Sequence, residues 1–227
     1  MKNYEFILLD IDGTLLDFEA CEFDSLEKTF SSVGIPFNKD IYNNFHSINA
    51  SLWARYEKKE IPKNEILDTR FAILFEKLGF EFDPLKTDAV YREYLAGAHV
   101  FEKGAPELLD YLKSKYRLYI VTNGTAANQV RRLKDSGIDK IAEGVFISEI
   151  IGCPKPQPEF FEAAAAKIEG FEKDKSIIIG DSLTSDMRGG NNFGIDTLWY
   201  NPKHLENTEN VKITYETDSL DKIKLFL

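Results

Sequence analysis

The first candidate catalytic residues are Asp10 and Asp12, in the segment Asp10-Ile-Asp-Gly-Thr14. An Asp carboxylate can attack a phosphate ester and form an aspartyl-phosphate, which water then breaks down. The leaving alkoxide needs a proton, and a carboxyl group two residues on can supply it and later serve as base for the water. The Asp-x-Asp spacing therefore provides both groups that this kind of phosphoryl transfer needs.

A second set of polar residues can meet the negative charge of a transferred phosphoryl group. It consists of Thr122, Asn123 and Lys155, the last lying between two prolines. Phosphoryl transfer depends mostly on positioning and on preorganised donors and cations. The Thr122 hydroxyl, the Asn123 backbone N–H and the Lys155 ammonium suit that task.

Two further acids, Asp181 and Asp186, add negative charge. Carboxylates placed together raise one another's pKa, so a functional cluster needs a cation to keep it ionised. Magnesium prefers carboxylate oxygens and water and leaves coordination positions for a phosphate, whereas soft metals prefer Cys and His. The acids therefore predict a Mg²⁺ site.

The elements that must position these residues are short buried strands. Apolar runs at 4–9, 118–121, 177–179 and 197–200 each end in polar residues, and helical patterns lie between them at 105–114, 126–136, 158–168 and 184–193. This alternation predicts an α/β fold, a doubly wound Rossmann-like parallel sheet with helices on both faces. Ligands of such sheets bind beyond the carboxyl ends of the strands, where the candidate residues fall.

Residues 18–98 interrupt this alternation. They carry long amphipathic helical patterns without a convincing strand, for example the apolar stripe of Ile66, Phe71, Leu74, Phe75 and Leu78. We expect an all-helical domain at 18–98, inserted into a core formed by 1–17 and 99–227.

Composition and charge limit the kinds of ligand and partner that the chain is expected to bind. The chain has 227 residues, 43% of them hydrophobic and 29% charged, and a formal charge of −10. That charge opposes binding to nucleic acid polymers, and small anions remain as ligands. The two distant cysteines suggest no disulfide framework, and no signal-length or membrane-length apolar run is seen. We expect a cytoplasmic monomer or homodimer that does not bind membranes.

These motifs together resemble the haloacid dehalogenase superfamily, across nearly the whole chain. They are Asp10-Ile-Asp-Gly-Thr-Leu15, Thr122, Lys155-Pro156 and Gly180-Asp-Ser-Leu-Thr-Ser-Asp186. The resemblance implies that Asp10 is the nucleophile, Asp12 the general acid/base, and Thr122 and Lys155 the phosphoryl binders. It further implies that Asp181 binds Mg²⁺ with Asp10 and the Asp12 carbonyl. Asp186 would orient Lys155 or hold metal-bound water, and the helical insertion would be a cap domain.

A narrower likeness points to pyrimidine 5′-nucleotidases of the house-cleaning type. It rests on the segments Asn49-Ala-Ser-Leu-Trp53, Tyr56-Glu57, Arg70-Phe71, Ile147-Ser-Glu149 and Asp196-Thr-Leu-Trp-Tyr-Asn201. The resemblance implies nucleoside 5′-monophosphates as substrates. Trp53, Tyr56 and Arg70 could face a base or ribose, or could equally serve the packing of the cap or a surface ion pair.

Several alternatives stay open. The superfamily also contains metal-free dehalogenases, but these lack the second aspartate, so Asp12 favours phosphoryl transfer. A sugar-phosphate or phosphoglycolate phosphatase, or a phosphomutase, would share the same core residues. A receiver-like module that accepts and holds a phosphoryl group on Asp10 is the alternative outside enzymes. Thr122 could also cap the helix near Ala126, and Gly124 could supply a left-handed turn.

Overall fold

A computed structural model describes residues 2–227, which divide into two compact units. One, here called the core unit, joins the segment ending at Phe18 to His99–Leu227. The other, the helical unit, is Glu19–Ala98.

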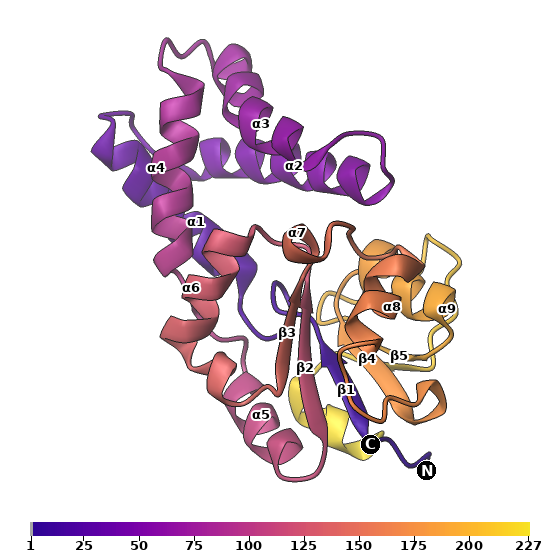
Figure 1. Cartoon of the computed structure of the whole chain (residues 1–227). Helices are drawn as coiled ribbons and strands as arrows, with labels where there is room; N and C mark the ends of the chain where they lie inside the picture. Colours follow the sequence, from indigo (N-terminus) through magenta and orange to yellow (C-terminus); the bar gives the residue numbers. More distant parts are fainter. Residues whose placement is uncertain (1) are drawn as a thin grey trace. The chain divides into compact units, whose positions relative to one another are not determined.

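The core unit is built on a parallel sheet of six strands (Figure 1). The strand order is β3-β2-β1-β4-β5-β6, so the order reverses beside β1. A doubly wound sheet binds ligands at this reversal, beyond the carboxyl ends of its strands. The strands are β1 (Phe6–Leu9), β2 (Arg117–Thr122), β3 (Gly144–Ile147), β4 (Ser176–Gly180), β5 (Asp196–Tyr200) and β6 (Tyr215–Thr217).

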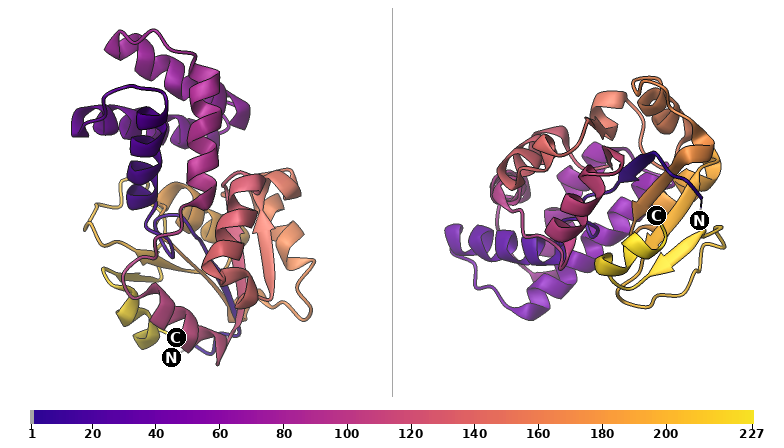
Figure 2. Two further views of the ribbon diagram at one scale, coloured as in Figure 1. Left: turned by 90° about the vertical axis from the view of Figure 1, so that its left-hand side faces the viewer. Right: turned by 90° about the horizontal axis from the view of Figure 1, so that it is seen from below.

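Helices cover both faces of the sheet, as the views in Figure 2 show. Along β1 the side chains alternate: Ile7 and Leu9 pack with α5 on one face, and Phe6 and Leu8 pack with α8 on the other. A strand buried on both faces needs a continuous apolar run, which is how it was predicted. The core helices are α5 (Ala105–Lys113), α6 (Ala126–Ser136), α7 (Ser148–Ile151), α8 (Pro158–Ala165) and α9 (Arg188–Phe193).

The predicted helix at 184–193 is two elements. A π-helical turn spans Leu183–Met187 and continues into α9. The Ser182 hydroxyl caps the turn by accepting from the Ser185 N–H at 3.1 Å. Such wide turns recur at functional sites, and this one carries Asp186. The glycine pair after it permits close packing, because a Cβ on Gly189 would lie 2.6 Å from the Phe161 ring.

The helical unit consists of α1 (Phe18–Ser32), α2 (Lys39–Glu57), α3 (Lys63–Leu78) and α4 (Pro84–Gly97). Its boundaries follow local chemistry: the Asn38 side chain caps α2, Asp83 caps α4, and α3 ends at left-handed Gly79. Its interior is aromatic, with Phe45, Phe71 and Tyr91 in mutual ring contact.

Candidate active site

The register of the central strands brings the predicted site residues to one edge of the sheet. Leu9 pairs with Ile120 of β2 and Ile179 of β4, so these three strands end at nearly the same level. Asp10 follows β1 directly and its N–H donates to the Ile179 carbonyl at 3.0 Å. Thr122 ends β2 and Asp181 follows β4.

Lys155 is the centre of a buried ionic network. Its Nζ donates to Asp10 Oδ1 at 2.5 Å, to Asp186 Oδ1 at 2.7 Å and to the Val121 carbonyl at 2.9 Å. The side chain is only 1% exposed. Although burial alone lowers the pKa of this ammonium, the Asp10 and Asp186 carboxylates outweigh it and hold the pKa above its usual range. The lysine is therefore a fixed cation at the end of β1.

The Asn123 side chain sets the position of that lysine. Its Nδ2 donates to the Lys155 carbonyl and its Oδ1 accepts from the Lys155 N–H, both at 2.9 Å. This two-bond pairing ties the end of β2 to the loop that carries the lysine. Asn123 was predicted through its backbone N–H, and its side chain adds this second contribution.

Three carboxylates, those of Asp10, Asp181 and Asp186, converge on one point. One oxygen of each lies within 4.8 Å of the others. Burial raises the pKa of Asp10 well above its usual value; Lys155 opposes this shift and Asp186 adds to it. Burial and then the neighbouring Asp186 raise the pKa of Asp181 to about 7. Negative charge at this edge therefore exceeds what one lysine offsets.

The donor set fits a hard divalent cation. Carboxylate oxygens are the ligands that Mg²⁺ prefers, and a cation would offset the burial and the Asp186 charge that raise the pKa of Asp181. Of the predicted metal ligands, Asp10 and Asp181 contribute side-chain oxygens to the cluster, and Asp186 joins them. The Asp12 carboxylate binds elsewhere, which leaves its backbone carbonyl as the group that the resemblance assigns to the metal.

Gly13 and Thr14 position the Asp181 carboxylate. The Thr14 hydroxyl donates to Asp181 Oδ1 at 3.2 Å. Gly13 has φ of 81°, and a Cβ there would lie 2.6 Å from Asp181 Oδ2. The turn after β1 thus requires glycine twice, for its left-handed backbone and for the close approach of the carboxylate.

Asp12 is held by two residues that the sequence analysis did not find. Gln129 Nε2 donates to Asp12 Oδ2 at 2.6 Å, and Arg132 Nη1 donates to Asp12 Oδ1. Both belong to α6 and are nearly inaccessible to solvent. The sequence places Gln129 and Arg132 on the same face of the helix as Leu133. Polar residues at such positions are ordinarily interpreted as exposed to solvent, so their burial was not expected.

Thr122 does not cap α6, and Gly124 does not form a left-handed turn. The Thr122 hydroxyl accepts from the Gly124 N–H at 3.1 Å and from Gln129 Nε2 at 2.8 Å, whereas Thr125 occupies the cap position of α6. Gly124 has no left-handed backbone, so that expectation was wrong. Its physical reason is contact, because a Cβ there would overlap the Gln129 side chain.

The three candidate specificity residues of the helical unit have different surroundings. Arg70 is 3% exposed and its Nε donates to Asp88 Oδ1 at 2.6 Å, so it belongs to the interior of the unit. Trp53 and Tyr56 are half-buried and in edge-to-face contact at 5.7 Å between ring centroids. Lys63 Nζ lies 5.8 Å and 5.5 Å from their ring centroids. The aromatic pair keeps partly exposed surface, which Arg70 lacks.

Within residues 2–227, no helix is both long enough and apolar enough to cross a membrane.

Comparison with known proteins identifies close relatives. Residues 4–194 match the model of the haloacid dehalogenase-like hydrolases. The chain is 42% identical to the pyrimidine 5′-nucleotidase PynA of Streptococcus pneumoniae, covering 96% of each, and 28% identical to the pyrimidine 5′-nucleotidase YjjG of Escherichia coli, covering 99% and 98%. A crystal structure of the HAD-hydrolase YfnB of Bacillus subtilis, described as bound to magnesium and as revealing interdomain movement, superposes with a TM-score of 0.95 at 36% identity over 100% of this chain and 99% of that one.

Proposed function

Because the chain belongs to the haloacid dehalogenase-like hydrolases, we propose that it is a Mg²⁺-dependent phosphomonoesterase acting on nucleoside 5′-monophosphates, pyrimidine ones first. The observation that carries the proposal is the buried Lys155 bonded to Asp10 and Asp186 at the end of β1. The pyrimidine nucleotidases among the relatives support the substrate class.

Asp10 is the proposed nucleophile. Its carboxylate forms a bond to phosphorus as the bond from phosphorus to the ester oxygen breaks, giving an aspartyl-phosphate. Lys155 is bonded to Asp10 Oδ1, which leaves Oδ2 for the attack. A bound Mg²⁺ would neutralise the carboxylate cluster and hold a phosphate oxygen.

Asp12 moves the proton in both half-reactions. As an acid it gives a proton to the departing ester oxygen, which leaves as the nucleoside hydroxyl. As a carboxylate it then takes a proton from water, whose oxygen bonds to phosphorus while the bond to Asp10 breaks. Phosphate is released and Asp12 is again protonated, so the cycle consumes one water.

Thr122 and the backbone N–H of Asn123 bind the phosphoryl oxygens. A hydroxyl that accepts two hydrogen bonds, as that of Thr122 does, still has its own hydrogen to donate. Donors fixed in this way stabilise charge that grows in the transition state.

The cytoplasmic location and the monomeric or homodimeric state stay predictions.

The test is phosphate release with Mg²⁺ across nucleoside monophosphates, sugar phosphates and phosphoglycolate. We expect the highest kcat/KM for pyrimidine nucleotides and loss of turnover in Asp10→Asn, with an unchanged circular dichroism spectrum. If sugar phosphates lead, the phosphatase stands and the substrate class fails. A wild-type enzyme that keeps phosphate on Asp10 without turnover would instead support the receiver-like alternative.

A further inference from the structure

Two buried side chains of α6 hold the carboxylate of Asp12 from its two oxygens. Arg132 Nη1 binds Oδ1 and Gln129 Nε2 binds Oδ2. The Arg132 side chain is 2% exposed, whereas that of Asp12 is 26% exposed. The two side chains that bind the carboxylate are therefore buried, whereas the carboxylate itself stays partly exposed.

The Gln129 amide has one orientation that satisfies all its neighbours. Its Nε2 donates to Asp12 and, at 2.8 Å, to Thr122 Oγ1, while its Oε1 accepts from Arg132 Nη1 at 3.2 Å. The flipped amide would place an oxygen against a carboxylate. The four residues form one connected network, so the position of Asp12 is tied to that of Thr122.

Gly124 completes this arrangement. The Gln129 side chain crosses the space that a Cβ at Gly124 would occupy. A methyl group there would push the amide away from Asp12 and Thr122, because buried side chains have little room to shift.

We propose that Gln129 and Arg132 are positioning residues that fix the acid/base carboxylate of Asp12 relative to the phosphoryl-binding Thr122. The inference rests on the proposed function, because it assigns Asp12 its role in proton transfer. A carboxylate offers about four lone-pair sites, so two donors leave one on each oxygen for the leaving group and the water. The network sets the direction of these remaining sites.

A network that only fastened α6 to the sheet would affect every substrate alike. Positioning of Asp12 has a different signature, because the two half-reactions depend on it differently. A nitrophenolate ion leaves without needing a proton, so attack of Asp10 on 4-nitrophenyl phosphate does not require Asp12. Hydrolysis of the aspartyl-phosphate does require it, whatever the substrate was.

The experiment compares wild type with Arg132→Met and Gln129→Met. For a pyrimidine nucleoside monophosphate we expect kcat to fall about 100-fold with KM changed less than threefold, the size typical of general acid–base effects. For 4-nitrophenyl phosphate we expect a rapid burst of about one nitrophenol per enzyme, followed by slow turnover. The kcat of Arg132→Lys should be at least tenfold higher than that of Arg132→Met, because the lysine ammonium can still donate to Asp12.

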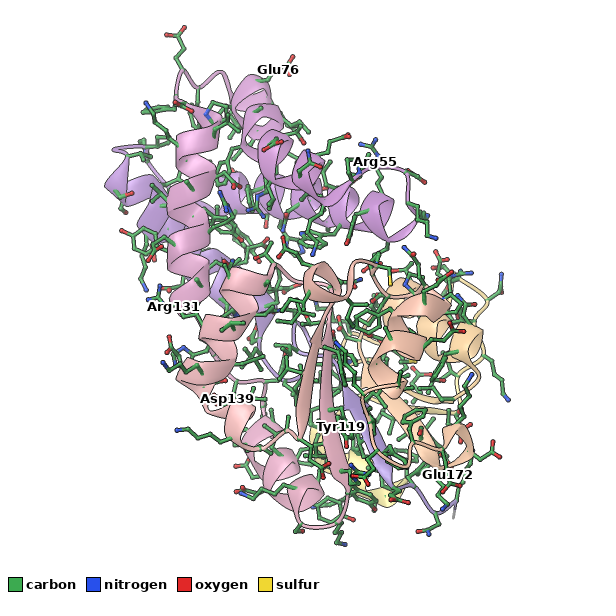
Figure 3. All side chains as sticks on the ribbon, in the orientation of Figure 1. Arg55, Glu76, Tyr119, Arg131, Asp139 and Glu172 are labelled. Carbon is green, nitrogen blue, oxygen red and sulfur yellow. The ribbon has the colours of Figure 1, made fainter. Side chains whose placement is uncertain are left out.

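The matched control is Arg131→Met, which removes the same charge from the neighbouring position. Arg131 is on the outward side of α6, with 49% of its side chain exposed (Figure 3). We expect wild-type kinetics. Two results in a folded Arg132→Met or Gln129→Met variant would refute the positioning role. One is a wild-type kcat, and the other is loss of the nitrophenol burst together with the loss of turnover. If Arg132→Met fails to fold, Gln129→Met decides, since it keeps the ion pair.

Failure of the proposed function gives a different result. It appears in the wild type alone, as an absence of phosphate release from every ester. If only the nucleotide substrate is wrong, the burst with 4-nitrophenyl phosphate still tests the positioning role.

Discussion

Magnesium affinity should depend steeply on pH, because the cation must displace a proton from Asp181. The pKa of this carboxyl is raised to about 7 in the metal-free protein, by burial and by the adjacent Asp186. At pH 5.5 about 3% of Asp181 is ionised, and at pH 7.5 about three quarters. Since only the ionised form binds metal, protonation of Asp181 alone should make the apparent Kd about 25-fold larger at pH 5.5.

The same shift affects stability, and its sign follows from the protons bound. Between the ordinary pKa of 3.8 and about 7, the folded protein holds a proton on Asp181 that the unfolded chain has released. The contribution of this group to the free energy of unfolding therefore falls as pH rises through that interval. A bound Mg²⁺ would remove this loss of stability, because it favours the ionised form of Asp181 in the folded protein. At a fixed, saturating Mg²⁺ concentration the stabilisation should be about 2 kcal/mol greater at pH 7.5 than at pH 5.5.

Isothermal titration calorimetry in buffers of different ionisation enthalpy measures both quantities. We expect Asp181 to release about one proton per Mg²⁺ at pH 5.5 and about a quarter of a proton at pH 7.5, and Asp10, whose pKa burial raises, to add to the total release at both pH values. Asp181→Asn should bind more weakly with a flatter pH dependence. A Kd that changes less than threefold over this range, with no proton release at pH 5.5, would refute the reasoning.

Three further perturbations test other parts of the molecule. Lys155→Met should lower kcat at least 100-fold, because it removes the buried cation beside Asp10; phosphate release measures it, and activity within tenfold of wild type would contradict the role. Gly13→Ala should weaken Mg²⁺ binding at least tenfold by calorimetry, because its Cβ would displace Asp181; an unchanged Kd would show that the turn adapts. Arg70→Met should destabilise the helical unit by about 3 kcal/mol in chemical denaturation and leave Mg²⁺ affinity unchanged, whereas a loss below 1 kcal/mol would mean that the buried pair with Asp88 contributes little.

The strands that the sequence predicts are those buried on both faces. β1, β2, β4 and β5 are continuous apolar runs, and each was located to within two residues at either end. β3 and β6 were missed because they are the edge strands of the sheet, short and only partly buried. An edge strand needs an apolar face on one side alone. The four residues of β3 and the three of β6 are therefore too few to show a recognisable pattern of apolar residues.

The acids and the lysine of the site were accessible to sequence reasoning for a similar reason. Asp10, Asp181 and Lys155 follow strands or prolines, where a charged residue interrupts an apolar context. Gln129 and Arg132 lie inside a helix, where polar residues ordinarily face water. Their burial follows from the tertiary partner, the Asp12 carboxylate more than a hundred residues earlier in the chain, and no local pattern encodes it.

The cluster also explains why the core unit tolerates so much negative charge at one edge. Isolated buried carboxylates would take up protons, as the raised pKa of Asp181 indicates. Lys155 compensates Asp10 and Asp186, and Arg132 compensates Asp12, so each cation serves a different part of the site. Asp181 accepts from the Thr14 hydroxyl, a neutral donor, and Lys155 lowers its pKa only in part. Because its pKa lies at about 7, its titration falls within the pH range in which metal binding is measured.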